Sequence, residues 1–232
     1  MYIYIMRHGE TYWNKDGKIQ GSSDIELTEF GVELAKLSAD GFFRDGICFD
    51  RIYTSPLTRA IRTAELIAEK NLKSYKKVSN DAGKDGQTEA DFRIDSRIRE
   101  MCFGKYEGLK LKELRNHDEN IVNCFAHPDL YIADETGETY DEVYARIDDF
   151  MERELLPLEQ NPELKNVLVL CHGTVIRAFL SRINSIDLEG FWKIRQPNCS
   201  INKIELKNGT FTSVQENILY YESEELMHRG IL

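Results

Sequence analysis

The sequence contains few of the residues that define disulfide-rich, zinc-binding or membrane proteins. Its 232 residues include only 5 cysteines and 5 histidines, and no apolar run is long enough to span a bilayer. The cysteines are odd in number and widely spaced, without a Cys-x-x-Cys pair, which is typical of reduced thiols. The chain opens on an apolar strand pattern, with no basic segment and cleavage site before it, so we expect a cytoplasmic protein.

Positive charge is also scarce. The 30 Lys and Arg residues are outnumbered by 40 Asp and Glu residues, for a formal net charge of -10. Nucleic acids and anionic membranes are bound by basic faces, so we expect neither as a partner. Hydrophobic residues make up 41% of the chain, enough for one core, and we expect a single domain over residues 1–232. The oligomeric state is not indicated.

Two apolar runs, at residues 2–6 and 167–171, are each followed closely by the dipeptide His-Gly. Such runs are typical of buried strands in an α/β sheet, where ligands bind beyond the carboxyl ends of the strands. One histidine at a strand end is more often structural, but two in the same context favour a site. We therefore expect His8 and His172 in one crevice, where Gly9 and Gly173 allow backbone N–H groups to approach a bound phosphate.

Strands and helices alternate along the chain. Thr28 is a plausible N-cap, and Ser55 with Pro56 is typical of a helix start. An extended piece is expected near Ile98, and the Gly- and Asp-rich segment 80–92 is expected to be an exposed loop. The predicted helices cover residues 28–39, 55–70, 109–115, 140–155 and 174–183. The predicted strands cover residues 2–7, 48–54, 166–171, 201–206 and 210–214, the last two joined at Asn208-Gly209.

Two arginines fall near the two histidines in this arrangement. Arg7 directly precedes His8, and Arg59 lies in the first turn of the helix that follows residue 55. Guanidinium groups pair with phosphate oxygens, and helix N-termini attract anions. A lone Arg59 would be better explained as a surface side chain, but together these residues indicate an anion site.

Ordered motifs then follow one another: Arg-His-Gly-Glu-Thr at 7–11, Ser-Pro-Leu-Thr-Arg-Ala at 55–60, Arg-Glu-Met at 99–101 leading to Tyr-Glu-Gly at 106–108, Cys-His-Gly at 171–173 and Pro-Asn-Cys-Ser at 197–200. Together they resemble the histidine phosphatase superfamily, also called phosphoglycerate mutase-like. The resemblance implies a three-layer α/β sandwich with a mostly parallel central sheet flanked by helices, and a small helical cap inserted at about residues 104–140.

The resemblance also implies a role for each site residue. His8 would be the nucleophile that takes the phosphoryl group, and Glu100 would be the proton donor. No metal and no other cofactor is implied, and the partner would be a small phosphorylated metabolite. The implied phosphate ligands are Arg7, Asn14, Arg59 and His172, with backbone groups near Gln20, Gly21 and Gly173. A neutral imidazole can attack phosphorus in line, and fixed cations stabilise the charge on the transferring group.

Two other classes of function fit some of these residues. His8, His172 and Glu100 could be ligands in a metal-dependent hydrolase, but Arg7 and Arg59 would repel a divalent cation and no compact ligand spacing is present. A non-catalytic binder of phosphorylated ligands is less expected, since the nucleophile, the acid and both arginines are all retained.

Within the family, phosphatase competes with cofactor-dependent phosphoglycerate mutase. The mutases, as the resemblance implies, carry an adjacent Arg pair after the proton-donor Glu. Here residues 116–145 contain no Lys or Arg and eight acids. If this segment covers the leaving group, it disfavours a second anion and a mutase, and favours leaving groups that are neutral or cationic; the alternative is a solvated cap without influence on selectivity. The tripeptide Gly137-Glu138-Thr139, which precedes the helix predicted at residues 140–155, resembles the phosphatase branch. We therefore predict a metal-independent phosphomonoester phosphatase.

Overall fold

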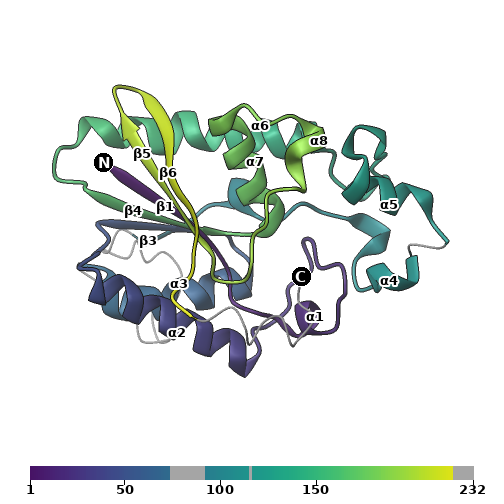
Figure 1. The fold of residues 1–232 in the computed structure, drawn as a ribbon, viewed down its shortest axis with the longest axis horizontal. Coiled ribbons are helices and arrows are strands. Elements are labelled where there is room, and N and C mark those ends of the chain that lie inside the picture. Colours follow the sequence, from purple (N-terminus) through teal and green to yellow (C-terminus); the bar gives the residue numbers. More distant parts are fainter. Residues whose placement is uncertain (74–91, 115–116, 222–232) are drawn as a thin grey trace, which may run out of the picture.

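The computed structural model describes residues 1–73, 92–114 and 117–221. Within them, one six-stranded sheet has the order β3-β2-β4-β1-β5-β6 (Figure 1). The strands β1 to β4 pair in parallel, whereas β5 pairs with β1, and β6 with β5, in antiparallel fashion. The mostly parallel sheet is thus confirmed only in part. The strands are β1 (Tyr2–Arg7), β2 (Arg51–Thr54), β3 (Phe92–Ile94), β4 (Asn166–Cys171), β5 (Ile201–Lys207) and β6 (Thr210–Ile218).

The central strands are buried on both faces, which explains their continuous apolar runs. In β1, Ile3 and Ile5 pack into one apolar core, and Tyr4 and Met6 into a second core on the opposite face. Successive side chains of a strand point to opposite faces, so such a strand contributes to two cores at once. The layers are therefore helix, sheet and helix.

Helices cover both faces of the sheet. In Figure 1, α2 and α3 lie below it and α6 and α7 above it. Thr28 caps α2 as predicted, because its side chain accepts a hydrogen bond from the Gly31 N–H. The helices are α1 (Tyr12–Lys15), α2 (Glu29–Arg44), α3 (Thr58–Asn71), α4 (Leu111–Leu114), α5 (Glu119–Ala126), α6 (Tyr140–Phe150), α7 (Gly173–Asn184) and α8 (Leu188–Phe191).

The segment expected as a cap, 104–140, contributes no strand within its described residues. It holds the short helices α4 and α5 and two 3₁₀ turns, Gly104–Tyr106 and Pro128–Leu130. These elements lie beyond one end of the sheet (Figure 1). Their description as a cap within a single domain of residues 1–232 stays a prediction.

The start of α3 differs from the prediction. Ser55 and Pro56 precede the helix, which begins at Thr58 with Leu57 as its N-cap residue. The Ser55 hydroxyl lies 2.7 Å from Nε2 of His172. A residue that was expected to cap a helix therefore contacts the predicted site.

Two further predicted elements differ in detail. Ile98 belongs to a 3₁₀ turn, Ser96–Ile98, and the strand lies earlier, at Phe92–Ile94. The helix expected to reach residue 155 ends as an α-helix at Phe150 and continues as a π-helical turn, Met151–Leu155. The predicted loop 80–92 falls almost wholly outside the described residues.

The β-hairpin at the end of the sheet is confirmed. Asn208 and Gly209 both have positive φ, 52° and 72°, as the favoured two-residue hairpin turn requires. Asn and Gly tolerate these angles better than other residues, which explains why this turn could be recognised in the sequence.

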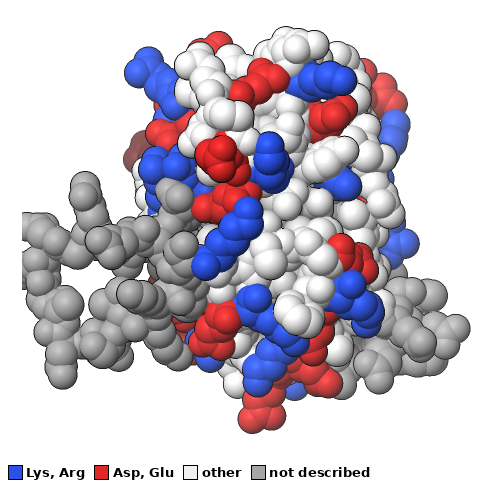
Figure 2. All heavy atoms as spheres, turned by 90° about the vertical axis from the view of Figure 1, so that its left-hand side faces the viewer, with Lys and Arg blue, Asp and Glu red and all other residues white. Residues whose placement is uncertain are grey.

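The surface and the cysteines agree with the composition. All five cysteines are free. Among the described residues, no helix has both the length and the apolar composition needed to cross a bilayer. On the face at the left-hand side of Figure 1, Lys and Arg side chains are interspersed with Asp and Glu side chains (Figure 2). The described residues of this face therefore form no continuous basic surface.

Candidate active site

The register of the central sheet brings the two His-Gly dipeptides together. The strands β1 and β4 are parallel neighbours in which Arg7 lies opposite Cys171. The His8 N–H donates to the Cys171 carbonyl at 3.1 Å. The ring centroids of His8 and His172 are 5.1 Å apart. The expectation that both imidazoles meet beyond the strand ends is confirmed.

Gly9 is needed for a close backbone contact, and its N–H is not offered to a ligand. A Cβ built on Gly9 would lie 2.5 Å from the Gly31 carbonyl oxygen, at the start of α2. The Gly9 N–H donates to the Thr63 hydroxyl at 3.1 Å. The prediction that this N–H approaches a bound phosphate is therefore wrong, because the N–H is bonded to Thr63 of α3 and Gly9 packs against Gly31 of α2.

The hydrogen bonds of His8 define which nitrogen is free. Its Nδ1 lies 2.6 Å from the Gly9 carbonyl oxygen, which can only accept, so Nδ1 carries the proton and Nε2 keeps its lone pair. Burial, with the positive charges of Arg59 and Arg7, holds the pKa of His8 well below its usual 6.5. His8 is therefore a neutral imidazole with one unprotonated nitrogen.

His172 is buried and both its ring nitrogens are occupied. Nδ1 accepts a hydrogen bond from Nε of Arg59 at 3.3 Å, so Nε2 carries the proton and donates to Ser55. Burial, followed by the charge of Arg59, holds the pKa of His172 well below 6.5. His172 is held beside His8 by Arg59 of α3 and by Ser55, the residue that follows β2.

Arg59 is fully buried, and it links the helix α3 to the loop before α2. Its Nη1 and Nη2 donate to the carbonyls of Ser23 and Gly21, each at 2.7 Å. Gly21 has a positive φ of 55°, which favours glycine. The predicted residues Arg59 and Gly21 are thus in direct contact, and Arg59 shapes the loop that borders the site.

Arg7 reaches the site from the end of β1. Its Nη1 donates to the Gln196 carbonyl at 2.6 Å, while its buried Nε has no hydrogen-bond partner among the described residues. Burial lowers the pKa of Arg7 from its ordinary value. Arg7 therefore retains a free donor.

Asn14 is the third residue of the short helix α1. Its side-chain oxygen accepts a hydrogen bond from the Asn198 amide at 3.3 Å.

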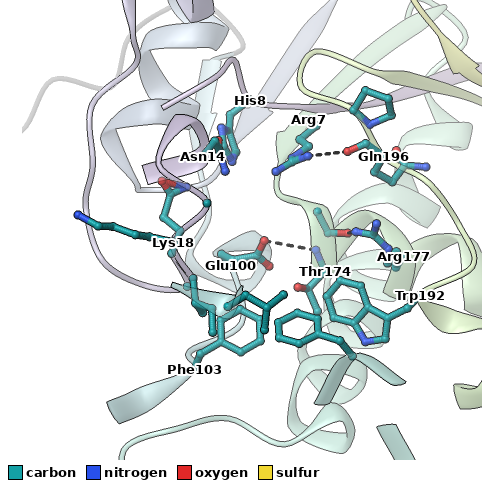
Figure 3. A pocket seen from close by; sticks show the side chains of 18 of the residues that line it. Arg7, His8, Asn14, Lys18, Glu100, Phe103, Thr174, Arg177, Trp192 and Gln196 are labelled. Atoms are coloured by element: carbon teal, nitrogen blue, oxygen red, sulfur yellow. Dashed lines mark hydrogen bonds between the residues drawn. The ribbon is translucent and has the colours of Figure 1, made fainter. Parts of the chain in front are cut away.

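Glu100 is 8% exposed and accepts two backbone hydrogen bonds. One oxygen accepts from the Met101 N–H at 2.9 Å, and the other accepts from the Thr174 N–H, in the first turn of α7, at 3.3 Å. The second bond fixes the carboxyl group against the segment that follows His172 (Figure 3).

These groups surround a cavity of about 330 Å³. Figure 3 shows Arg7 on one side and His8 and Asn14 on the other, with Glu100 below them and beside Thr174. Arg59 and His172 are not among the lining residues; Arg59 contacts His172, whose ring packs against that of His8. The predicted residues that line the cavity are Arg7, His8, Asn14, Gln20, Gly21, Glu100 and Gly173.

Comparison with known proteins identifies the family. Residues 3–219 match the model of the histidine phosphatase superfamily, branch 1. The chain belongs to this superfamily. It is similar to phosphoserine phosphatase 1 of Hydrogenobacter thermophilus, with 29% identity over 224 residues that cover 96% of this chain and 94% of the relative. It is also 29% identical, over 88% of its length and 84% of the relative, to an Escherichia coli protein named "Probable phosphoglycerate mutase GpmB".

A solved structure extends the similarity to three dimensions. The phosphoserine phosphatase of Entamoeba histolytica, crystallised as a mutant with phosphoserine, superposes with a TM-score of 0.72 at 27% identity. The superposition covers 93% of this chain and 96% of that structure. The family and these names agree with a phosphatase acting on small phosphorylated metabolites.

The acidic segment is placed differently from the lid that was predicted for this histidine phosphatase. None of the eight acids between residues 116 and 145 lines the cavity; among the described residues of that segment, 117–145, only Phe125 does. Glu138 instead pairs with Arg99 and Arg146, and Asp118 caps α5. The placement expected for these acids, over the leaving group, is therefore not found, and the alternative of a cap whose charges do not reach the leaving group agrees better with the structure.

Sequence reasoning missed several lining residues. Arg177 lies four residues after Gly173, one helical turn into α7, so the spacing argument used for Arg59 would have found it. Trp192 and Arg195 come from the irregular stretch around α8, which has no periodic signal. The lining residues outside the prediction include Lys18, Phe103, Phe125, Arg177, Trp192 and Arg195.

Potential metal ligands are dispersed. Within residues 1–73, 92–114 and 117–221, no group of three or more His, Cys, Asp or Glu side chains is placed to hold a metal ion. In the cavity itself, His8 and Glu100 face Arg7, whose charge favours an anion.

Proposed function

We propose that the chain is a metal-independent phosphatase that hydrolyses monoesters of small phosphorylated metabolites through a phosphohistidine on His8. The observation that carries this proposal is the hydrogen bond from Nδ1 of His8 to the Gly9 carbonyl, at 2.6 Å. It leaves Nε2 as the only nucleophilic nitrogen of a ring that lines a cavity beside Arg7 and Glu100.

In the first step, Nε2 of His8 attacks phosphorus and the ester oxygen leaves. The new bond joins nitrogen to phosphorus, and Glu100 in its protonated form gives its proton to the departing alkoxide. The transferring group carries negative charge on its equatorial oxygens, which the free Nε of Arg7 and the amide of Asn14 stabilise. In the second step, Glu100 takes a proton from water, whose oxygen displaces His8 from phosphorus.

Arg59 and His172 support this chemistry without lining the cavity, by positioning residues that do. Arg59 holds the carbonyls of Gly21 and Ser23, and His172 packs 5.1 Å from the His8 ring. Their direct contact with phosphate oxygens, implied by the family resemblance, remains part of this proposal. Arg59 keeps a second N–H on each Nη for such a contact, whereas His172 would have to give up its hydrogen bond with Ser55 or with Arg59.

The donor set favours phosphoryl transfer without a metal. A phosphate dianion fits a cavity lined by Arg7, Lys18, Arg177 and Arg195, whereas a divalent cation would be repelled by all four. Small metabolites fit a cavity of about 330 Å³ better than a nucleic acid or a membrane surface. We keep phosphoglycerate mutase as the alternative outcome of the assay.

The test is trapping of the intermediate. Rapid quenching with ³²P-labelled ester should give an acid-labile adduct on His8, and His8→Ala should lose both the adduct and turnover. Label on His172, or appreciable turnover by His8→Ala, would contradict the assignment. Phosphate release is compared with interconversion of 2- and 3-phosphoglycerate at the same enzyme concentration; faster interconversion would replace the phosphatase by the mutase.

A further inference from the structure

Arg177 lines the cavity, and the described residues of the protein accept only part of the hydrogen bonds that its guanidinium group can donate. Its Nη1 donates to the Gly173 carbonyl at 2.9 Å, but its buried Nε has no hydrogen-bond partner in the part of the chain that the structure describes. Among the described residues it forms no ion pair. A buried donor without an acceptor is costly, which indicates that a ligand supplies the acceptor.

The environment of Arg177 increases this cost. Burial, together with the nearby charge of Arg7, lowers the pKa of Arg177 to about 10. Its guanidinium carbon lies 4.6 Å from the centroid of the Trp192 ring, a favourable cation–π contact. The Trp192 ring is itself held by a hydrogen bond of 2.7 Å from Nε1 to the Tyr140 hydroxyl. The guanidinium is therefore preorganised, yet its charge is not neutralised.

In Figure 3, Arg177 and His8 lie on opposite sides of Arg7. A Cβ built on Gly173 would lie 3.1 Å from Nη1 of Arg177 and 3.7 Å from Nε of Arg7, so the two guanidinium groups flank this glycine. Arg7 is adjacent to His8 in the chain, whereas Arg177 lies beside Trp192 (Figure 3). If phosphate is bound by Arg7, Arg177 faces the group attached to it.

The charges around the cavity leave room for a second anion. Among the described residues, four cationic side chains line it, Arg7, Lys18, Arg177 and Arg195, against the single carboxyl group of Glu100. A phosphate dianion offsets only part of this excess. Arg195 is exposed at the rim, where it adds positive charge near Trp192.

We propose that Arg177, backed by Trp192, binds a carboxylate on the leaving group, so that the substrates are phosphate monoesters of small carboxylic acids. This inference rests on the proposed phosphatase function. The carboxylate accepts from the free Nε of Arg177 and replaces the missing acceptor. Arg195 contributes through its charge at the rim.

Two matched pairs of esters test the proposal with the wild-type enzyme. Phosphoserine and phosphoethanolamine differ by the carboxylate, and 3-phosphoglycerate and glycerol 3-phosphate differ by a carboxylate in place of a hydroxymethyl group. A charged hydrogen bond predicts that kcat/KM is roughly 10- to 100-fold higher for the acid of at least one pair. Hydrolysis without preference in both pairs would overturn the proposal and leave the phosphatase intact. No turnover of any ester, including p-nitrophenyl phosphate, would instead reject the proposed function.

Variants assign the preference to Arg177. Arg177→Gln should lower kcat/KM roughly 10- to 100-fold for the preferred acid and change its carboxylate-free partner less than about threefold. The control is Arg182→Gln on the same helix, because Arg182 pairs with Asp148 away from the cavity. This control should leave both members of the pair unchanged.

Inhibition by inorganic phosphate separates the two anion sites. If Arg177 binds the phosphoryl group instead, Arg177→Gln will slow both esters equally and weaken inhibition by inorganic phosphate, and the proposal is wrong. Turnover of the carboxylate-free ester also shows that the variant is folded. Should Arg177→Gln be unfolded, the exposed Arg195→Gln is measured instead: a loss of at least about twofold confined to the acid supports the charged site, and no change contradicts it.

Discussion

The two buried histidines should make folding stability depend on pH in a predictable direction. His8 and His172 both have a pKa well below 6.5 in the folded protein, chiefly because burial disfavours their charged forms. In the unfolded chain each titrates near 6.5. Between these values the unfolded state binds protons that the folded state does not. The contribution of these two histidines to the unfolding free energy is therefore fully present above the unfolded pKa, and it is lost as the pH decreases through that value.

The magnitude follows from proton linkage. A histidine that stays neutral when folded loses about 1.4 kcal/mol of unfolding free energy between pH 7.5 and pH 5.5, so the pair loses about 2.7 kcal/mol. Urea unfolding is measured at both pH values in buffers without phosphate, for the wild type and for the double variant His8→Gln/His172→Gln. The remaining histidines and the carboxyl groups are common to both proteins and cancel in the comparison.

The wild type should lose about 2.7 kcal/mol more than the double variant over this range. Each single variant should account for about half of the difference, which also covers the case of a double variant that does not fold. Equal losses in wild type and variants would mean that the rings are protonated in the folded protein at pH 5.5. That result would refute the lowered pKa of the two histidines in the folded protein.

Two other changes probe the acid and the backbone contact. Glu100→Gln should lower kcat/KM, which reports the first step alone, by roughly 10²- to 10⁴-fold for alkyl esters but by less than about tenfold for p-nitrophenyl phosphate, because nitrophenolate leaves without a proton. Steady-state kinetics on both esters measures this, and an equal loss of kcat/KM for both would exclude the acid role. Gly31→Ala should lower the unfolding free energy by about 1–3 kcal/mol, because its Cβ would overlap the Glu10 carbonyl. Urea unfolding checks the second prediction, and an unchanged midpoint would contradict the contact.

Much of the fold could be predicted because the central strands are buried on both faces. The runs at β1 and β4 are apolar without alternation, and the end of each is marked by His-Gly. Their parallel pairing then places His8 beside His172, whatever the rest of the chain does. Local chemistry was also sufficient at Thr28 and at Asn208-Gly209, where one side chain or one φ angle defines the structure.

Tertiary contacts account for what could not be predicted. Serine is a common residue at helix N-caps, which is why Ser55 was predicted to cap α3. A hydrogen bond to His172, 117 residues later, places it in the site instead. The acids of residues 116–145 suggest a negatively charged lid. Only the folded chain shows that Glu138 forms ion pairs with Arg99 and Arg146. Charge counted along a segment says which charges exist, and the packing of the segment decides which of them face the cavity.

The cavity and the whole chain have charges of opposite sign, and distance decides which one a substrate experiences. The chain has a formal net charge of -10, which repels an approaching phosphate ester at long range. At physiological ionic strength, exposed charges are screened beyond about 8 Å, so most of that repulsion is absent near the site. The cations that line the cavity act at contact distance and in a partly desolvated setting, where they are screened far less. An acidic protein can therefore bind doubly anionic esters, provided that its acids are paired with other side chains and its arginines face the cavity.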